Sequence, residues 1–259
     1  MKCEIMNLKE IKNIGFIGLG VMGSPMCKNL LKNKKWHIIV HDLDNSKEKE
    51  LEKNGASIAK NLNELFNVAD MIITCLPGGN FVKEIYFGEK KIVSEINPDK
   101  LIIDMSTSQP DLMIELNKLI TKKGSFFADA PIARTRQAAR DGTLAIMVGS
   151  KREVYERIFP ILEFMGNNIM HCGDVGTGQI TKILNNMILF QTVVALSEAA
   201  NIAEKYNMSV EYLFENISKC SGDSFALRNH GLKSIAQITS LPPHFLQNMP
   251  LKTFLMQLI

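Results

Sequence analysis

Short apolar runs alternate with amphipathic stretches along the first 172 residues of this chain. The apolar runs are typical of buried strands, and the stretches between them repeat apolar residues at helical spacing. The predicted strands are residues 14–17, 37–41, 71–75, 101–104, 125–129, 144–148 and 168–171. The predicted helices are residues 25–32, 47–54, 62–66, 82–87, 111–122 and 153–165. Strand–helix alternation of this kind indicates an α/β fold with a mainly parallel sheet that is covered on both faces.

The pattern changes after Gly178, where residues 179–206 contain no proline or glycine and apolar residues recur at helical spacing. A helix of that length spans about 40 Å, which is longer than a small domain needs. It is predicted to join two domains, residues 1–173 and residues 174–259, and a further helix is predicted at 210–219.

The composition of the chain is typical of a globular protein that does not bind nucleic acid. The chain has 259 residues, of which 46% are hydrophobic and 22% charged, and a net charge of +3. This balance is typical of a globular protein and does not indicate a nucleic-acid partner. Five scattered cysteines without a CxxC pair favour reduced thiols in the cytoplasm over disulfides or a metal site. No apolar run approaches the roughly 20 residues of a membrane span, and the start "MKCEIMNLKEIKN" lacks the pattern of a signal peptide.

A glycine-rich turn follows the first predicted strand. Gly18, Gly20 and Gly23 have GxGxxG spacing, which allows a tight turn and a close approach of the backbone to a pyrophosphate at a helix N-terminus. Asp42 ends the next strand, where a carboxylate accepts the ribose hydroxyl of NAD and repels the 2′-phosphate of NADP. The pattern therefore favours NAD over NADP. The alternative is that Asp42 caps the helix that begins near Ser46.

Two further loops follow predicted strands at the same edge of the sheet. These are "TCLPGG" at 74–79 and "DMSTSQP" at 104–110. Ligands bind at that edge in α/β sheets. Ser106 and Thr107 could equally cap the helix that is predicted to begin at Asp111.

Lys182 and Asn186 lie four residues apart near the start of the long helix, and so on one face of it. A lysine that is partly desolvated between two domains has a lowered pKa and can exchange a proton with a substrate hydroxyl. From spacing alone, the alternative is that the pair forms part of a solvated helix face.

Several motifs in order resemble the 3-hydroxyisobutyrate dehydrogenase (β-hydroxyacid dehydrogenase) family, which is related to 6-phosphogluconate dehydrogenase. They are residues 16–26, "DMST", "DAP", "GTLAIMVG" and "GQITKILNN", and the resemblance covers residues 14–237. It implies a Rossmann-type doubly wound sheet followed by an all-α domain that helps to form a homo-oligomer. It also implies an NAD(P)-dependent oxidoreductase that interconverts a small anionic 3-hydroxy acid and its semialdehyde.

The resemblance also implies roles for particular residues. Lys182 is the expected catalytic acid/base and Asn186 a substrate contact. The expected cofactor contacts are Gly18, Leu19, Gly20, Val21, Met22, Gly23, Asp42, Leu76, Pro77 and Thr107.

One departure from the family pattern lies after "DAP". In the family, a Ser-Gly-Gly segment binds the substrate carboxylate. This chain has Ala133, Arg134 and Thr135 in its place. Arginine offers a bidentate fork to an anion, and relatives that reduce sulfolactaldehyde resemble this pattern. A sulfolactaldehyde or tartronate-semialdehyde reductase is therefore an alternative function. Another reading makes Arg134 a surface charge.

The second departure is the tail at 238–259, which has no clean helix or strand period. Family members continue there into further helices that carry a Lys-Asp pair. A one-base shift near residue 237 would permit a family-like segment that includes Lys-Asp, so the tail is predicted to be out of frame and the α-domain incomplete. A truncated, inactive remnant of low stability that only binds dinucleotide is the third possibility.

Overall fold

The computed structural model describes residues 10–88 and 92–236, and the hypothesis about the tail at 238–259 lies outside them. The chain forms two compact units, of which the first ends at Ile183 and the second begins at Leu184. Both units include part of one long helix, α9 (Thr177–Lys205).

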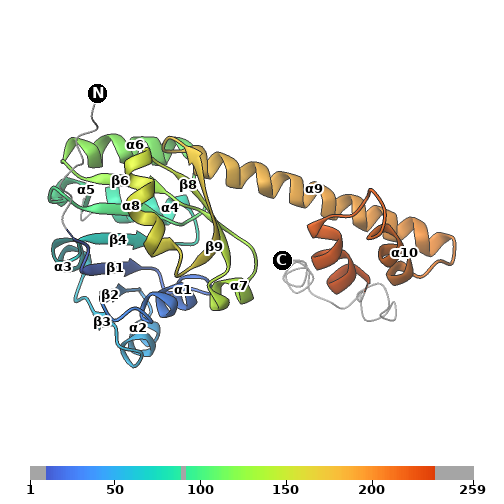
Figure 1. Ribbon diagram of the computed structural model, residues 1–259, viewed down its shortest axis with the longest axis horizontal. Helices are drawn as coiled ribbons and strands as arrows, with labels where there is room; N and C mark the ends of the chain where they lie inside the picture. Colours follow the sequence, from blue (N-terminus) through green and yellow to red (C-terminus); the bar gives the residue numbers. More distant parts are fainter. Residues whose placement is uncertain (1–9, 89–91, 237–259) are drawn as a thin grey trace. The chain divides into compact units, whose positions relative to one another are not determined.

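The first unit is built on a sheet of nine strands within the described residues (Figure 1). The strand order is β3-β2-β1-β4-β5-β6-β8-β7, with β9 also paired to β8. Strands β1 to β6 pair in parallel, while β8 runs antiparallel to β6 and β7. The bounds are β1 Asn13–Ile17, β2 His37–His41, β3 Ser57–Ile58, β4 Met71–Thr74, β5 Leu101–Asp104, β6 Phe126–Asp129, β7 Ile132–Ala133, β8 Leu144–Gly149 and β9 Gly166–Gly173.

Helices cover both faces of this sheet, because side chains that alternate along each strand supply two separate cores. In β4, Met71 and Ile73 belong to one core and Ile72 to the other. The first core is closed by α1 (Gly23–Leu30), α2 (Asn45–Glu52), α7 (Arg136–Asp141) and α8 (Arg152–Leu162). The second is closed by α3 (Leu62–Val68), α4 (Gly79–Phe87), α5 (Ile92–Glu95) and α6 (Pro110–Lys122). The predicted α/β class is confirmed.

Most predicted elements lie within three residues of their observed bounds, but the shortest ones were missed. β3, β7 and α5 span two to four residues, which is too short to show a period. The sequence analysis also predicts no helix at α7 (Arg136–Asp141). This helix is capped by Thr135, whose Oγ1 accepts a hydrogen bond from the Ala138 N–H at 3.2 Å.

The second unit contains the later part of α9, then α10 (Val210–Ile217) and a π-helix, η1 (Leu227–Ile235). Its core joins Leu196 and Ala200 of α9 to Phe214 of α10 and Leu227 of η1. The π-helix was not predicted. α9 is also long and apolar enough to cross a membrane, a test that core helices of soluble proteins pass as well. The sequence analysis predicted this helix but not as a candidate membrane span, because polar residues interrupt its apolar run.

Candidate active site

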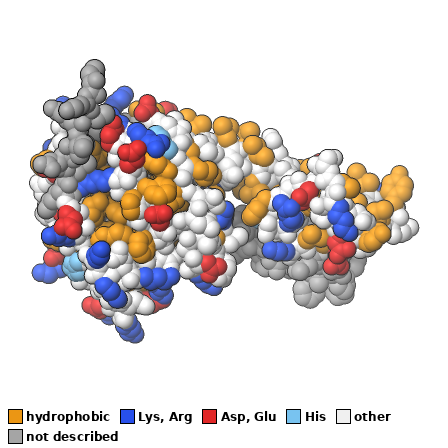
Figure 2. All heavy atoms as spheres, in the orientation of Figure 1, with side chains coloured by type: hydrophobic (Ala, Val, Ile, Leu, Met, Phe, Trp, Pro, Cys, Tyr) orange, Lys and Arg blue, Asp and Glu red, His pale blue; other side chains and the backbone are white. Residues whose placement is uncertain are grey.

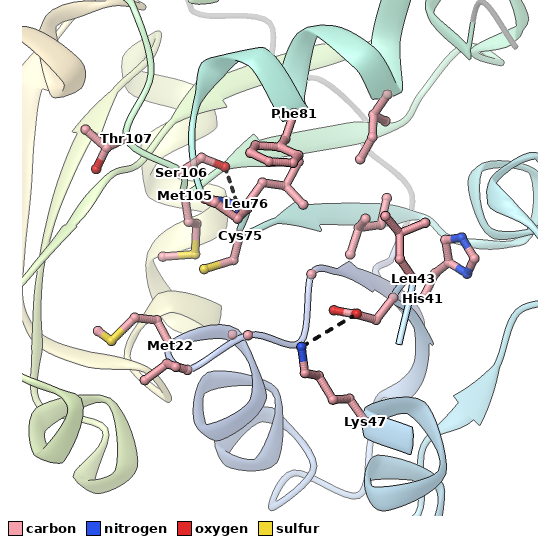
Figure 3. A pocket seen from close by; sticks show the side chains of 18 of the residues that line it. Met22, His41, Leu43, Lys47, Cys75, Leu76, Phe81, Met105, Ser106 and Thr107 are labelled. Carbon is pink, nitrogen blue, oxygen red and sulfur yellow. Dashed lines mark hydrogen bonds and ion pairs between the residues drawn. The ribbon is translucent and has the colours of Figure 1, made fainter. Parts of the chain in front are cut away.

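A cavity of about 580 Å³ opens in the first unit, where the loops after β1, β2, β4 and β5 meet (Figure 3). These strands are parallel, so their carboxyl ends lie at one edge of the sheet. Nine of the ten predicted cofactor residues line the cavity: Gly18, Gly20, Val21, Met22, Gly23, Asp42, Leu76, Pro77 and Thr107. The tenth, Leu19, is buried beside it.

Two positions of the glycine loop, Gly18 and Gly23, are packed too tightly for larger residues. Gly18 has φ +94°, and a Cβ on it would lie 2.3 Å from the carbonyl oxygen of Cys75. A Cβ on Gly23 would lie 2.0 Å from the carbonyl oxygen of Gly18. α1 begins at Gly23 without a side-chain cap, which leaves backbone N–H groups available to an anion.

One end of the cavity is charged, because Asp42 and Lys47 both line it, and Figure 3 labels Lys47 there. The Lys47 Nζ lies 3.9 Å from Asp42 Oδ1, and Asp42 Oδ2 accepts a hydrogen bond from the Leu19 N–H at 2.5 Å. The alternative of Asp42 as a helix cap is wrong. Asp44 caps α2 instead, because its Oδ1 accepts from the Ser46 N–H at 3.0 Å.

The other end is lined by the sulfur-bearing side chains of Met22, Cys75 and Met105 (Figure 3). Burial, followed by the charge of Asp104, raises the pKa of Cys75 to about 12, so this thiol stays protonated near neutral pH. A flat apolar ring would find apolar contacts at this end, whereas a ribose would find hydrogen-bonding partners at the other.

Ser106 joins the loop after β4 to the loop after β5 and does not cap a helix. Its Oγ accepts from the Leu76 N–H at 2.9 Å and donates to Asp104 Oδ1 at 2.6 Å. The following helix, α6, has Gln109 at its N-cap position without a side-chain hydrogen bond. Thr107 is exposed and lines the cavity.

Two buried carboxylates, Asp104 and Asp129, end the neighbouring strands β5 and β6. Asp129 accepts hydrogen bonds from the Gly176 N–H at 2.6 Å and the Gln179 N–H at 2.8 Å. Burial nevertheless raises the pKa of Asp129 to about 6, outweighing those two N–H groups, which favour the charged form. The pKa of Asp104 is also raised, chiefly by burial.

This raised pKa predicts how stability depends on pH. Between 3.8 and about 6, folded Asp129 keeps a proton that the unfolded chain has released. The contribution of Asp129 to the free energy of unfolding therefore falls as pH rises through this window, by about 3 kcal/mol in total. Urea unfolding of the wild type and Asp129→Asn at several pH values measures it, with the exposed Asp111→Asn as control. Parallel pH curves for the wild type and Asp129→Asn would contradict it.

Lys182 lies on α9, one turn beyond the segment that Asp129 holds. It is partly buried, and this burial lowers its pKa below the usual lysine value of 10.5. A freely solvated lysine would not show this shift. Asn186 lies on the same helix but belongs to the second unit, where its Oδ1 accepts from Asn185 Nδ2 at 3.3 Å. A joint role of Lys182 and Asn186 stays a prediction.

The loop with Ala133, Arg134 and Thr135 follows Ile132, which lines the cavity, but none of the three lines it. Arg134 has φ +89°, a conformation that glycine adopts freely and an arginine rarely adopts. Its Nη1 donates to the Thr143 carbonyl oxygen at 2.6 Å and to Asn167 Oδ1 at 2.8 Å. The guanidinium is exposed, but unlike a solvated surface charge it makes two hydrogen bonds within the protein.

The sequence analysis missed several lining residues, among them His41, Lys47, Phe81 and Met105. Of these, Lys47 follows Asp42 by five residues, so its place at the same end of the cavity could have been expected. The described residues hold no cluster of three or more His, Cys, Asp or Glu side chains suited to a metal ion.

Comparison with known proteins agrees with this geometry. A family described as the NAD binding domain of 6-phosphogluconate dehydrogenase matches residues 13–173. A second, described as NAD-binding of NADP-dependent 3-hydroxyisobutyrate dehydrogenase, matches residues 176–252. The chain belongs to the 3-hydroxyisobutyrate dehydrogenase family. The predicted Rossmann-type fold and nicotinamide cofactor are thereby confirmed.

Relatives in the 3-hydroxyisobutyrate dehydrogenase family cover most of the chain. The mitochondrial 3-hydroxyisobutyrate dehydrogenase of Mus musculus is 38% identical over 81% of this chain and 62% of its own length. The 2-(hydroxymethyl)glutarate dehydrogenase of Eubacterium barkeri is 36% identical over 85% of this chain and 72% of its own. This chain thus spans less than two thirds of the mouse relative. A cytoplasmic location stays a prediction.

A solved structure of the same family is similar over most of the chain. The 3-hydroxyisobutyrate dehydrogenase of Mycobacterium tuberculosis, solved with L-serine, superposes with a TM-score of 0.81 at 30% identity. The superposition covers 90% of this chain and 81% of that one. The similarity therefore extends beyond the sheet into the helical unit.

Proposed function

We propose that this chain transfers a hydride between NAD and a small 3-hydroxy acid, interconverting the alcohol and its semialdehyde. The observation that carries the proposal is the cavity at the sheet edge, where the glycine loop, Asp42 and the loops after β4 and β5 converge. Relatives that are 36–38% identical to this chain are named 3-hydroxyisobutyrate dehydrogenase and 2-(hydroxymethyl)glutarate dehydrogenase. Lys182, partly desolvated on α9, supplies the acid/base.

The proton balance assigns the role of Lys182. A nicotinamide dinucleotide held by the glycine loop and Asp42 would supply the hydride acceptor for the carbinol carbon. The neutral Lys182 amine takes the hydroxyl proton as the carbonyl forms, so that the alcohol loses one hydride and one proton. In the reverse direction Lys182 starts as the ammonium ion and returns that proton to the carbonyl oxygen. Its burial-lowered pKa makes both states accessible nearer to neutral pH than for a solvated lysine.

NAD is proposed as the preferred dinucleotide. The Asp42 carboxylate lies at the charged end of the cavity and would face the ribose, where it repels a 2′-phosphate. Lys47, 3.9 Å from Asp42, offsets part of that charge, so the preference for NAD should be moderate.

A homo-oligomer is proposed as well. α9 carries exposed apolar side chains within the second unit, including Leu184, Met187, Ile188, Phe190 and Val194 (Figure 2). A contiguous apolar stripe of this kind is typical of an interface.

A sulfonate or tartronate-semialdehyde substrate is the alternative, in which the exposed Arg134 guanidinium would bind the anionic group. We expect Arg134→Gly to raise the KM for an anionic substrate by about tenfold or more, because one charge-assisted pair is lost. At φ +89° the glycine relieves strain, so stability should not fall. Steady-state kinetics with 3-hydroxyisobutyrate, glycerate and 2,3-dihydroxypropane-1-sulfonate, each with NAD and NADP, identify the substrate.

The exposed Arg140→Ala, on the neighbouring helix α7, is the matched control and should leave every KM unchanged. An unchanged KM in Arg134→Gly would make Arg134 a structural residue. NADH binding by fluorescence without turnover of any substrate would instead identify a chain that only binds dinucleotide.

A further inference from the structure

Gln179, in the first turn of α9, is fully buried and makes one hydrogen bond to the end of β6 and two to the loop after β5. Its backbone N–H donates to Asp129 Oδ2 at 2.8 Å, at the end of β6. Its side-chain Oε1 accepts from the Ser108 N–H at 2.9 Å, and its Nε2 donates to the Ser106 carbonyl oxygen at 2.8 Å. A buried amide with both ends paired is held in one orientation.

The loop after β5, to which the Gln179 side chain is hydrogen-bonded, forms part of the cavity wall. Ser106 and Thr107 line the cavity, and the Ser106 hydroxyl accepts a hydrogen bond from the Leu76 N–H, which belongs to the opposite loop. Asp104 fixes that hydroxyl and also accepts from Thr74 Oγ1 at 2.7 Å. A movement of these loops as the dinucleotide binds therefore reaches Gln179 through two hydrogen bonds.

The first turn of α9 is held from the other side by a close backbone contact. A Cβ on Gly178 would lie 2.4 Å from the Met147 carbonyl oxygen, and a Cβ on Gly149 would lie 2.8 Å from the Gly178 N–H nitrogen. Asp129 accepts hydrogen bonds from two N–H groups in this segment. The sheet thus fixes the backbone of the helix start, while Gln179 sets its orientation toward the loop after β5.

Lys182 lies three residues beyond Gln179, on the neighbouring position of the same helix face. We propose that Gln179 is a positioning residue that couples the occupied dinucleotide cavity to α9, so that Lys182 is held in place for proton transfer when the cofactor is bound. This inference rests on the proposed function. It assigns Gln179 no contact with substrate or cofactor.

The test uses the full chain with Gln179→Met, which keeps the side-chain length and removes both side-chain hydrogen bonds. Hydrogen–deuterium exchange of residues 174–183 is followed with and without NADH, together with kcat and KM. In the wild type, NADH should slow exchange in this segment. In Gln179→Met that slowing should be lost and kcat should fall about 10- to 100-fold, with KM for NAD nearly unchanged.

Two further variants keep the result interpretable. Thr181→Val removes the hydrogen bond from Thr181 Oγ1 to the Thr177 carbonyl oxygen within α9 but leaves Gln179 intact, so it should behave as the wild type. Gln179→Asn retains the amide on a shorter side chain that cannot reach both Ser106 and Ser108. It should show the same loss even if the methionine variant fails to fold.

The two proposals fail in different ways. If the wild type binds no NADH, the proposed function and this inference are both wrong. If NADH binds and slows exchange equally in the wild type and both Gln179 variants, only the inference is overturned. A loss of thermal stability with unchanged coupling and unchanged kcat would also overturn it, since it would reduce Gln179 to a packing residue.

Discussion

Lys182→Met is expected to lower kcat by about 10²- to 10⁴-fold, the usual effect of removing a general acid/base. Methionine keeps the length and the apolar stem of the side chain, so the half-buried position should stay filled. NADH affinity should not change, because Lys182 does not line the dinucleotide cavity of the first unit. Stopped-flow or steady-state turnover together with NADH fluorescence titration measures both quantities.

The role of Lys182 also predicts how turnover depends on pH in each direction of the reaction. Oxidation needs the neutral amine, so kcat/KM for the alcohol should rise with pH through the pKa of Lys182. Because burial lowers that pKa, the limb should lie below 10.5. The reduction of the aldehyde needs the ammonium ion and should fall over the same range.

The matched control is Lys205→Met, an exposed lysine in the last turn of the same helix, which should leave turnover unchanged. If Lys182→Met retains wild-type kcat and its pH limb, another group transfers the proton and the proposed role of Lys182 is wrong.

Gly23→Ala has the second largest expected effect, a combined loss of stability and dinucleotide binding. The added methyl group would lie 2.0 Å from the carbonyl oxygen of Gly18, a backbone atom that cannot rotate away. We expect about 1–3 kcal/mol of destabilisation, as is usual for overpacking, and a displaced glycine loop. Thermal unfolding and NADH titration report the two losses.

Gly20→Ala separates the two effects on the same loop. No heavy atom lies within 4 Å of a Cβ built on Gly20, so the variant should keep the wild-type Tm. Gly20 lines the cavity, so the methyl group should still weaken NADH binding. Equal Tm losses in both variants, or wild-type NADH affinity in Gly23→Ala, would contradict this account of the loop.

The sheet could be predicted from the sequence because its signals are local. Buried parallel strands appear as apolar runs, and the residues of one run divide between two cores by simple alternation, as Met71 and Ile72 do. The glycine loop was predictable for the same reason, since its function requires glycines at fixed spacing after a strand. Asp42 lies at the cavity as predicted, and the alternative that it caps α2 is excluded because Asp44 is the capping acceptor.

The sequence could not show the conformation of the segment that carries Arg134. Arg134 stands where the family has a glycine, and its positive charge predicts a contact with an anion. Its φ of +89° and its hydrogen bonds to Thr143 and Asn167 depend on β8 and β9 lying beside it. Only the folded chain shows that an arginine occupies a backbone position suited to glycine.

By itself, the sequence determined the α/β class, the order of the longer strands along the chain, the nicotinamide cofactor and the residues around the glycine turn. The tertiary structure decided which polar residues act together. Asp129 and Gln179 are 50 residues apart, and Ser106 and Gln179 are 73 apart, yet each pair shares a buried hydrogen bond. The physical reason is that a local period reports the burial of each segment, whereas partner choice among buried polar groups is set by packing between distant segments.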